Sequence, residues 1–169
     1  MELSEIKEKF LKILGIADVY QMPQRLMEVV ISNETDTYER VVQEVGDMTN
    51  DWLQKIFQYY HADRKEKMQD YTPKSLAMFI GKLTGKADVV VDLCTGSGAL
   101  TIQTWNMNHE QKFELYEFDE NVIPFLLFNM AVRNIECTVY HSDVLQQEIF
   151  HIYRISKGEV FGEFREVMK

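Results

Sequence analysis

The predicted fold is organised around one segment, Val89-Val90-Val91-Asp92-Leu93-Cys94-Thr95-Gly96-Ser97-Gly98. Its valines are β-branched and predict a fully buried strand of a parallel sheet, and a segment compatible with a helix follows the two glycines. In open α/β sheets, ligands bind beyond the carboxyl ends of the strands, where glycines let the backbone approach a ligand closely. The succession of strand, glycine turn and helix therefore predicts a small-molecule site at this turn.

The glycine turn alone leaves two other interpretations open. A dinucleotide site would require the pattern G-x-G-x-x-G, but Thr101 stands where the third glycine belongs, which counts against a nucleotide-binding oxidoreductase. The turn could also be structural and bind nothing, because two glycines a residue apart are a weak signal. The neighbouring segments are needed to decide.

The first 70 residues form a predicted helical region without a catalytic signal. Apolar residues recur there at helical spacing in four segments, at about residues 2–15, 25–31, 38–45 and 51–67. Gly15 is a natural stop for the first of these helices, and Thr49, Asn50 and Asp51 offer caps for the last. The apolar stripe along the last helix is interpreted as core.

The remaining sequence alternates predicted helices and strands. Thr72-Pro73 starts a helix that ends near residue 85 and turns an apolar stripe inward, formed by Leu76, Phe79, Ile80 and Leu83. Strands are predicted at 112–117 and 136–140, with a helix at about 120–133 between them. Residues 146–155 are compatible with a helix, and 159–164 with a short strand or hairpin arm. Strands that alternate with helices indicate an α/β fold with a parallel sheet.

Three segments flank the glycine turn in a recognisable order and spacing, namely Gln69-Asp70-Tyr71-Thr72-Pro73-Lys74, Leu115-Tyr116-Glu117-Phe118-Asp119 and His141-Ser142-Asp143. Together with the turn they resemble the S-adenosylmethionine (SAM) site of the N6-adenine DNA methyltransferases, in particular the modification subunits of type I restriction systems. The resemblance covers about residues 50–145. It implies a Rossmann-like SAM-methyltransferase fold with an incomplete parallel sheet, divided into a helical N-terminal region at 1–70 and an α/β domain at 71–169.

The resemblance also implies which residues bind SAM: Tyr71, Thr72, Asp92, Cys94, Gly96, Gly98, Glu117, Phe118 and Asp143. The glycines let the backbone pass the methionine end of SAM, and the N–H groups of the turn can receive its carboxylate. Asp92 would accept hydrogen bonds from the turn, or from the SAM ammonium through water. The segment around Tyr71 and Thr72 would close over the methionine end, although physically it is an ordinary helix start.

The downstream acids are placed at the ends of the next two predicted strands. Glu117 would take both ribose hydroxyls, and Phe118 would offer its face to the adenine. Asp143 would accept a hydrogen bond from the adenine amino group. Each acid alone could equally be a helix cap or a loop residue, and Asp119 is predicted to be such a cap. Three acids at three successive strand ends favour a binding site.

The catalytic segment of this family is missing from the sequence. Adenine methyltransferases carry an Asn/Asp/Ser-Pro-Pro-Tyr/Phe segment that holds the target amino group and stacks on the flipped base. The prolines here are Pro23, Pro73 and Pro124, and no two are adjacent. About 26 residues follow Asp143, which we expect to be too few for the rest of a methyltransferase sheet. We therefore assign no catalytic residue.

Two hypotheses follow from the retained cofactor residues and the missing catalytic segment. In the first, the chain is the cofactor-binding part of a DNA adenine methyltransferase and is inactive in isolation. In the second, it is a non-catalytic SAM-binding or protein-interaction module that acts with a partner subunit. An oxidoreductase is a third, weaker alternative, supported by the glycine turn and Glu117.

The charge of the chain bears on its partners. The formal net charge is -9, whereas contact with nucleic-acid phosphates normally requires a basic face. Residues 61–86 hold six basic against three acidic residues, which we interpret as a solvated helix end. We therefore expect DNA binding only together with a partner subunit or a missing domain.

The cysteines, the histidines and the apolar residues limit which metal sites, disulfides and membrane spans the chain can have. Cys94 and Cys137 lie in or beside predicted strands and are expected to pack as reduced, small apolar residues. The histidines show no metal-ligand spacing, so no metal is expected. No apolar run approaches the roughly 18 residues of a membrane span, and the charged N-terminus is unlike a signal peptide, so a cytoplasmic location is expected.

Overall fold

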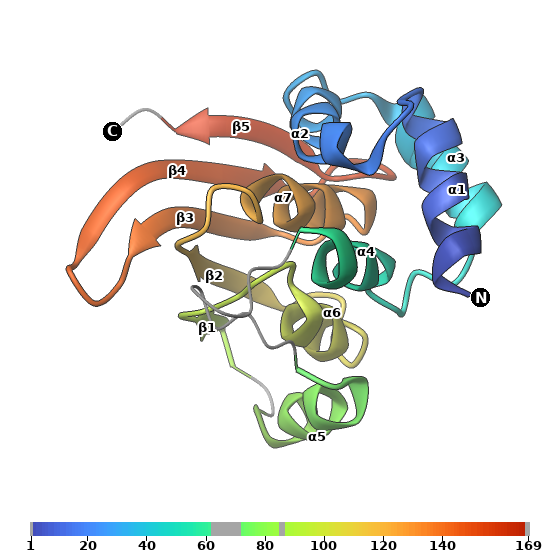
Figure 1. Cartoon of the computed structure of the whole chain (residues 1–169). Helices are drawn as coiled ribbons and strands as arrows, with labels where there is room; N and C mark the ends of the chain where they lie inside the picture. The colour runs from blue at the N-terminus through green and yellow to red at the C-terminus, as the bar shows by residue number, and fades with distance from the viewer. Residues whose placement is uncertain (1, 62–71, 85–86, 168–169) are drawn as a thin grey trace.

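The computed structural model describes residues 2–61, 72–84 and 87–167. It shows a mixed α/β arrangement in which a five-stranded sheet carries its helices together on one side (Figure 1). The helices are α1 (Leu3–Leu14), the short 3-10 helix η1 (Val19–Gln21), α2 (Met22–Ile31), α3 (Thr35–Val45), α4 (Trp52–Tyr60), α5 (Lys74–Thr84), α6 (Ala99–Trp105) and α7 (Ile123–Val132). The strands are β1 (Val89–Asp92), β2 (Lys112–Glu117), β3 (Cys137–Asp143), β4 (Glu148–Ser156) and β5 (Glu163–Val167).

The helices expected before residue 61 are all present. Gly15 ends α1 in the left-handed conformation, as a stop signal should. Helix α2 starts earlier than its apolar pattern suggested, because Pro23 falls in the first turn, where a missing N–H costs nothing. Asp51 caps α4 by accepting a hydrogen bond from the Gln54 N–H at 2.9 Å. The predicted end of this helix, after residue 61, lies outside the described residues.

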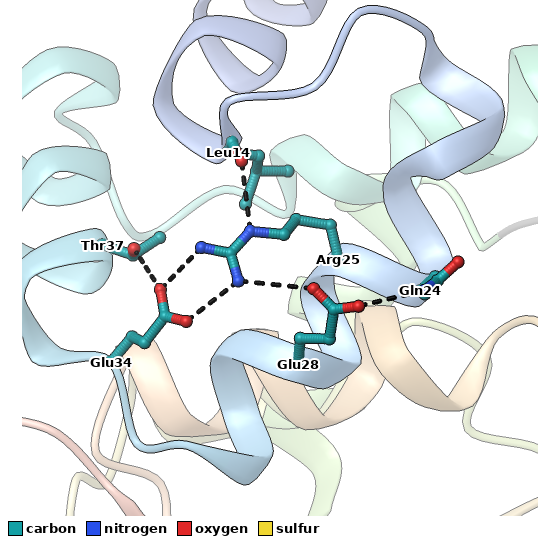
Figure 2. A network of polar contacts seen from close by, with 6 residues as sticks. All are labelled: Leu14, Gln24, Arg25, Glu28, Glu34 and Thr37. Carbon is teal, nitrogen blue, oxygen red and sulfur yellow. Dashed lines mark hydrogen bonds and ion pairs between the residues drawn. The ribbon is translucent and has the colours of Figure 1, made fainter.

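Arg25 on α2 joins three helices of the N-terminal region (Figure 2). Its guanidinium donates to both carboxylate oxygens of Glu34, at 2.9 and 2.7 Å, and to the carbonyl of Leu14 at 3.1 Å. Glu34 also accepts a hydrogen bond from the Thr37 hydroxyl at 3.0 Å. The hydrogen bond from Arg25 lowers the pKa of Glu34. This network fixes the end of α1 and the start of α3 against α2.

The sheet has the order β1-β2-β3-β4-β5. Strands β1, β2 and β3 are parallel, and α6 and α7 make the crossovers between them. Strands β4 and β5 continue the sheet as antiparallel neighbours. Helix α7 is buried along its whole length between α2 and the sheet, as expected for a helix that is apolar on all sides.

The expectation of a helix at 146–155 is wrong. From Glu148 onward these residues belong to β4, where Tyr153 and Ile155 are buried and Arg154 between them is exposed. That two-residue period is the burial pattern of a strand with one covered face. The next strand, β5, begins at Glu163, later than the short strand expected from residue 159.

The expectation that β1 is fully buried is also wrong. Val89 and Val91 are 42% and 53% exposed, whereas Val90 packs against the core. Within the described residues β1 is the edge strand, and Val89 and Val91 share the helix-free face of the sheet with Lys112 and Glu114 of β2. Cys94 just beyond β1 is likewise exposed rather than packed, whereas Cys137 is buried and both thiols are free.

The apolar stripe expected to face inward on α5 is mostly exposed, and Ile80 is its one half-buried member. Leu76, Phe79 and Leu83 are exposed, whereas Ala77 is fully buried. A Cβ added at Gly81 would lie 3.4 Å from backbone atoms of α6, so small residues let the two helices approach closely. The bulky stripe therefore faces away from α6.

Candidate functional site

The turn between β1 and α6 adopts the backbone conformation that its glycines permit. Gly96 and Gly98 have φ angles of 60° and 96°, in the left-handed region that other residues avoid. The N–H of Thr95 donates to the carbonyl of Tyr116 at 3.0 Å, which attaches the turn to β2. A Cβ on Gly98 would lie 2.7 Å from the terminal methyl of Met130, so α7 packs directly against the turn.

Glu117 at the end of β2 connects the turn with the segment after that strand. Its Oε2 accepts a hydrogen bond from the Gly96 N–H at 2.8 Å, and its Oε1 accepts one from the Asp119 N–H at 2.8 Å. Burial raises the pKa of this carboxyl, and the two N–H groups partly oppose the shift. Each oxygen keeps a further lone pair, so the carboxylate can still accept a pair of hydroxyl groups.

Asp92 and Cys94 lie at the same edge of the sheet. Asp92 Oδ1 accepts a hydrogen bond from the Cys94 N–H at 3.2 Å, and burial raises the pKa of the Asp92 carboxyl. The pKa of the Cys94 thiol is raised by burial first and then by the charges of Glu117 and Asp92. The three groups thus lie close together, and carboxylates at this place suit a cationic ligand.

A hollow of about 370 Å³ opens beside Glu117 and is lined by Phe118, Asp119, Glu120, His141 and Phe150. The Phe118 side chain is 60% exposed and presents its ring to solvent. His141 Nε2 lies 3.1 Å from the Phe118 carbonyl, and the His141 ring meets the Phe150 ring edge to face, with 5.0 Å between their centroids. The aromatic rings of Phe118, His141 and Phe150 are suited to bind a flat heterocycle, and the imidazole of His141 adds ring nitrogens to the lining.

Asp143 lies at the end of β3, which extends two residues further along the sheet than the position paired with Glu117. In the strand register His141 stands opposite Glu117, and Asp143 pairs with Glu148 of β4. The Asp143 carboxylate accepts hydrogen bonds from the N–H groups of Leu145 and Gln146, at 2.9 and 3.0 Å, and so caps the β3–β4 turn. The structure thus brings Asp92, Cys94 and Glu117 together at the glycine turn and places Asp143 in the neighbouring hairpin.

The segment before α5 is described only in part. Tyr71 lies outside the described residues. Thr72 is half-buried two residues before α5, and its carbonyl accepts a 3.5 Å hydrogen bond from the Gln54 side chain.

Of the residues that line the hollow, the sequence predicted only Phe118 as a site residue. It assigned Asp119 as a helix cap and did not single out Glu120, His141 or Phe150. His141 stood in the quoted segment, but the assignment followed the acid two residues later. Phe150 lies in β4, and the expectation of a helix there hid its place beside β3.

The described ranges contain no cluster of three or more histidine, cysteine, aspartate or glutamate residues that could hold a metal ion. In the same ranges, no helix has both the length and the apolar character needed to cross a membrane.

Comparison with known proteins gives one match. A model of the N-6 DNA Methylase family matches residues 42–160, which is more than half of the chain and includes the glycine turn, Glu117 and the hollow. Comparisons with curated proteins and with solved structures found no match. The chain belongs to the N-6 DNA methylase family.

Proposed function

We propose that this chain binds SAM beyond the carboxyl ends of β1 and β2, as the cofactor-binding part of a DNA adenine methyltransferase. The hydrogen bond from the Gly96 N–H to the Glu117 carboxylate carries the proposal. It joins the glycine turn to the acid of the next strand, directly beside a hollow with exposed aromatic faces. A site of this kind, beyond the strand ends of an α/β sheet, is where such folds bind nucleotide-like ligands.

The residues present fit the chemistry of SAM. Asp92 and Glu117 suit a ligand that carries a sulfonium and an ammonium group. The backbone of the glycine turn would pass close to the methionine end, and Glu117 would accept the ribose hydroxyls. The N–H groups of Gly96 and Gly98 donate to Glu117 and to the Thr95 carbonyl, so they would shape the turn rather than receive the methionine carboxylate. Cys94 would border the methionine end, and Tyr71 and Thr72 would close over it. When bound, SAM supplies an electrophilic methyl group.

The adenine of SAM would enter the hollow. Phe118 would stack on its face, and Phe150 would border it from β4. Two residues are candidates to accept a hydrogen bond from the adenine amino group, namely Asp143, by resemblance, and His141, which lines the hollow. Replacing each by alanine and comparing the SAM affinities assigns this role.

The finer fold assignment belongs to the same proposal. In a doubly wound Rossmann-like sheet the strand order reverses at the first strand, whose second side pairs with a later strand. The parallel order β1-β2-β3 and the crossover helices match one half of that arrangement. We retain the division into a helical region at 1–70 and a SAM-methyltransferase-like domain at 71–169.

We propose that the chain does not methylate DNA by itself. Its sequence has no adjacent prolines and hence no Asn-Pro-Pro-Tyr segment, and its net charge of -9 disfavours phosphate contact. A partner subunit or a further domain would hold the target base, and the complex would act in the cytoplasm.

One observation favours the second candidate function, a non-catalytic SAM-binding or protein-interaction module. Val89, Val91 and Leu93 expose apolar surface at the β1 edge. Parallel sheets usually have both faces covered, so a partner that packs there would complete the layer.

Calorimetric titration tests the cofactor assignment. We expect SAM to bind the wild-type chain at micromolar concentration and NAD not to bind. Asp92→Ala and Glu117→Ala should abolish SAM binding, whereas Glu34→Gln, in the network of α1 to α3, should not. A folded wild-type chain that binds no SAM refutes the proposal.

A labelled-methyl transfer assay on adenine-containing DNA tests the second part. We expect no transfer by the purified chain. Turnover by this chain alone would show that the missing segment is not required and that the division of labour is wrong.

A further inference from the structure

A buried carboxylate from the helical region reaches the centre of the glycine turn. Asp51, which caps α4, accepts a hydrogen bond on its Oδ2 from the Ser97 hydroxyl at 2.7 Å. Ser97 stands between the two glycines of the turn and is fully buried, and Asp51 is only 8% exposed. The two residues are 46 positions apart in the sequence. This contact therefore joins α4 to the turn.

Asn129 of α7 holds the other side of the same turn residue. Its side-chain amide nitrogen donates to Asp51 Oδ1 at 2.9 Å and to the backbone carbonyl of Ser97 at 2.8 Å. Both the hydroxyl and the carbonyl of Ser97 are thus fixed by partners outside the turn. This carbonyl belongs to the peptide that carries the Gly98 N–H, so that N–H is fixed as well, and it donates to the Thr95 carbonyl at 3.1 Å, which closes the turn.

Arg133, one helical turn further along α7, sets the orientation of Asn129. Its Nη1 donates to Asn129 Oδ1 at 2.9 Å, which leaves the amide nitrogen directed at Asp51 and Ser97. Nε and Nη2 donate to the carbonyls of Met48 and Asn50, at 2.8 and 2.7 Å, so the segment before α4 is held by the same side chain. Burial lowers the pKa of Arg133 to about 10, and the charge of Asp51 opposes that shift.

The network costs more than a simple helix cap requires. Burial raises the pKa of Asp51, and the charge of Arg133 with the hydrogen bonds from Ser97, Gln54 and Asn129 opposes this shift. A cap on the surface would serve α4 equally well without the desolvation of a carboxylate. The burial of the Asp51 carboxylate is explained if it also determines the conformation of the glycine turn that it contacts.

We propose that Asp51 is a positioning residue for the glycine turn, and that it acts through Ser97 to hold the turn in the conformation in which the Gly96 N–H meets the Glu117 carboxylate. Affinity for SAM then depends on the helical region, although that region lies outside the proposed cofactor-contacting set. This inference rests on the proposed function for the identity of the ligand. The effect on the turn itself can be measured without any ligand.

Two substitutions and one control test the proposal. Ser97→Ala removes only the hydroxyl, and Asp51→Asn keeps the size of the side chain but removes its charge. Glu34→Gln is the matched control, because it weakens a polar network of the same helical region that does not contact the turn. The chain contains eight glycines, so its amide spectrum after selective ¹⁵N-glycine labelling is simple enough to follow Gly96 and Gly98.

We expect Ser97→Ala and Asp51→Asn to shift the amide signals of Gly96 and Gly98 and to speed their hydrogen exchange about tenfold or more. We also expect these variants to weaken SAM binding about tenfold or more. Glu34→Gln should lower the melting temperature and leave the turn amides and the SAM affinity as in the wild type. A merely structural role for Asp51 would lower the melting temperature in all three and leave both readouts unchanged.

Turn amides that match the wild type in the folded Ser97→Ala and Asp51→Asn variants would overturn the proposal. If Asp51→Asn does not fold, Ser97→Ala decides alone. If the wild-type chain binds no SAM, the proposed function falls, and the exchange rates of Gly96 and Gly98 still decide whether Asp51 positions the turn.

Discussion

Gly98→Ala should destabilise the chain more than an alanine at another left-handed glycine. Gly98 has a φ of 96°, which costs an L-residue about 1–2 kcal/mol. Its new Cβ would also lie 2.7 Å from the Met130 methyl and 3.1 Å from a Leu126 methyl, and both side chains are fully buried. Overpacking of this kind costs about 1–3 kcal/mol. The lower entropy of the unfolded chain offsets roughly 0.4–1 kcal/mol of this loss, so we expect the free energy of unfolding to fall by about 1–4.5 kcal/mol.

Gly15→Ala is the matched control, since Gly15 has a φ of 68° and no atom lies within 4 Å of the Cβ that it would gain. It should cost about 1 kcal/mol, because only the backbone strain remains. Urea unfolding followed by circular dichroism gives both free energies of unfolding. Equal losses in Gly98→Ala and Gly15→Ala would refute the close packing of α7 on the turn, because the contact with Met130 would then cost nothing.

Three further predictions concern α5, the strand-end acids and Cys94. Ala77→Leu should lower the free energy of unfolding by about 1–3 kcal/mol because it separates α5 from α6, whereas Phe79→Ser should change it by less than about 0.5 kcal/mol. A larger loss in Phe79→Ser than in Ala77→Leu, measured by urea unfolding, would show that the apolar stripe of α5 faces inward after all. Burial raises the pKa values of Asp92 and Glu117 in the folded chain. Their contribution to stability is therefore present below the unfolded-state pKa values of about 4 and is lost as pH rises through the folded-state pKa values. The affinity for cationic SAM has the opposite pH dependence and falls as pH decreases, because the carboxylates become protonated. Thermal unfolding and calorimetry across pH 4–8 measure both, and SAM affinity that rises on acidification would contradict the binding role of these carboxylates. Cys94 is exposed but its thiol has a raised pKa, so iodoacetamide should modify it more slowly at pH 8 than it modifies a thiol of ordinary pKa. Bound SAM should slow the reaction further, and an unchanged rate with saturating SAM would show that Cys94 does not border the cofactor.

Elements with a clear local signal could be predicted from the sequence. The strand Lys112–Glu117 and the stop at Gly15 match the structure, because alternation of buried residues and a C-terminal glycine are properties of the segment itself. The meeting of the glycine turn with Glu117 also follows from local facts, since parallel strands end at one edge of the sheet.

Features that depend on distant neighbours could not be predicted. The apolar stripe of α5 has helical spacing, but the small residues Ala77 and Gly81 permit a closer approach to α6 than Phe79 would. The exposure of Val91 depends on β1 lying at the sheet edge, which a run of β-branched residues does not reveal. His141 enters the hollow because β3 continues past Tyr140 into a hairpin with β4, and the register of that hairpin has no local signature.

The most direct test of the cofactor site is hydrogen exchange by mass spectrometry with and without saturating SAM. We expect slower exchange in peptides that contain the turn after β1 and the segment around Glu117 and Phe118, no change in α1 to α3, and no effect of NAD. No change at the turn, or protection confined to another part of the chain, would contradict the claim that SAM binds where Glu117 meets the glycine turn.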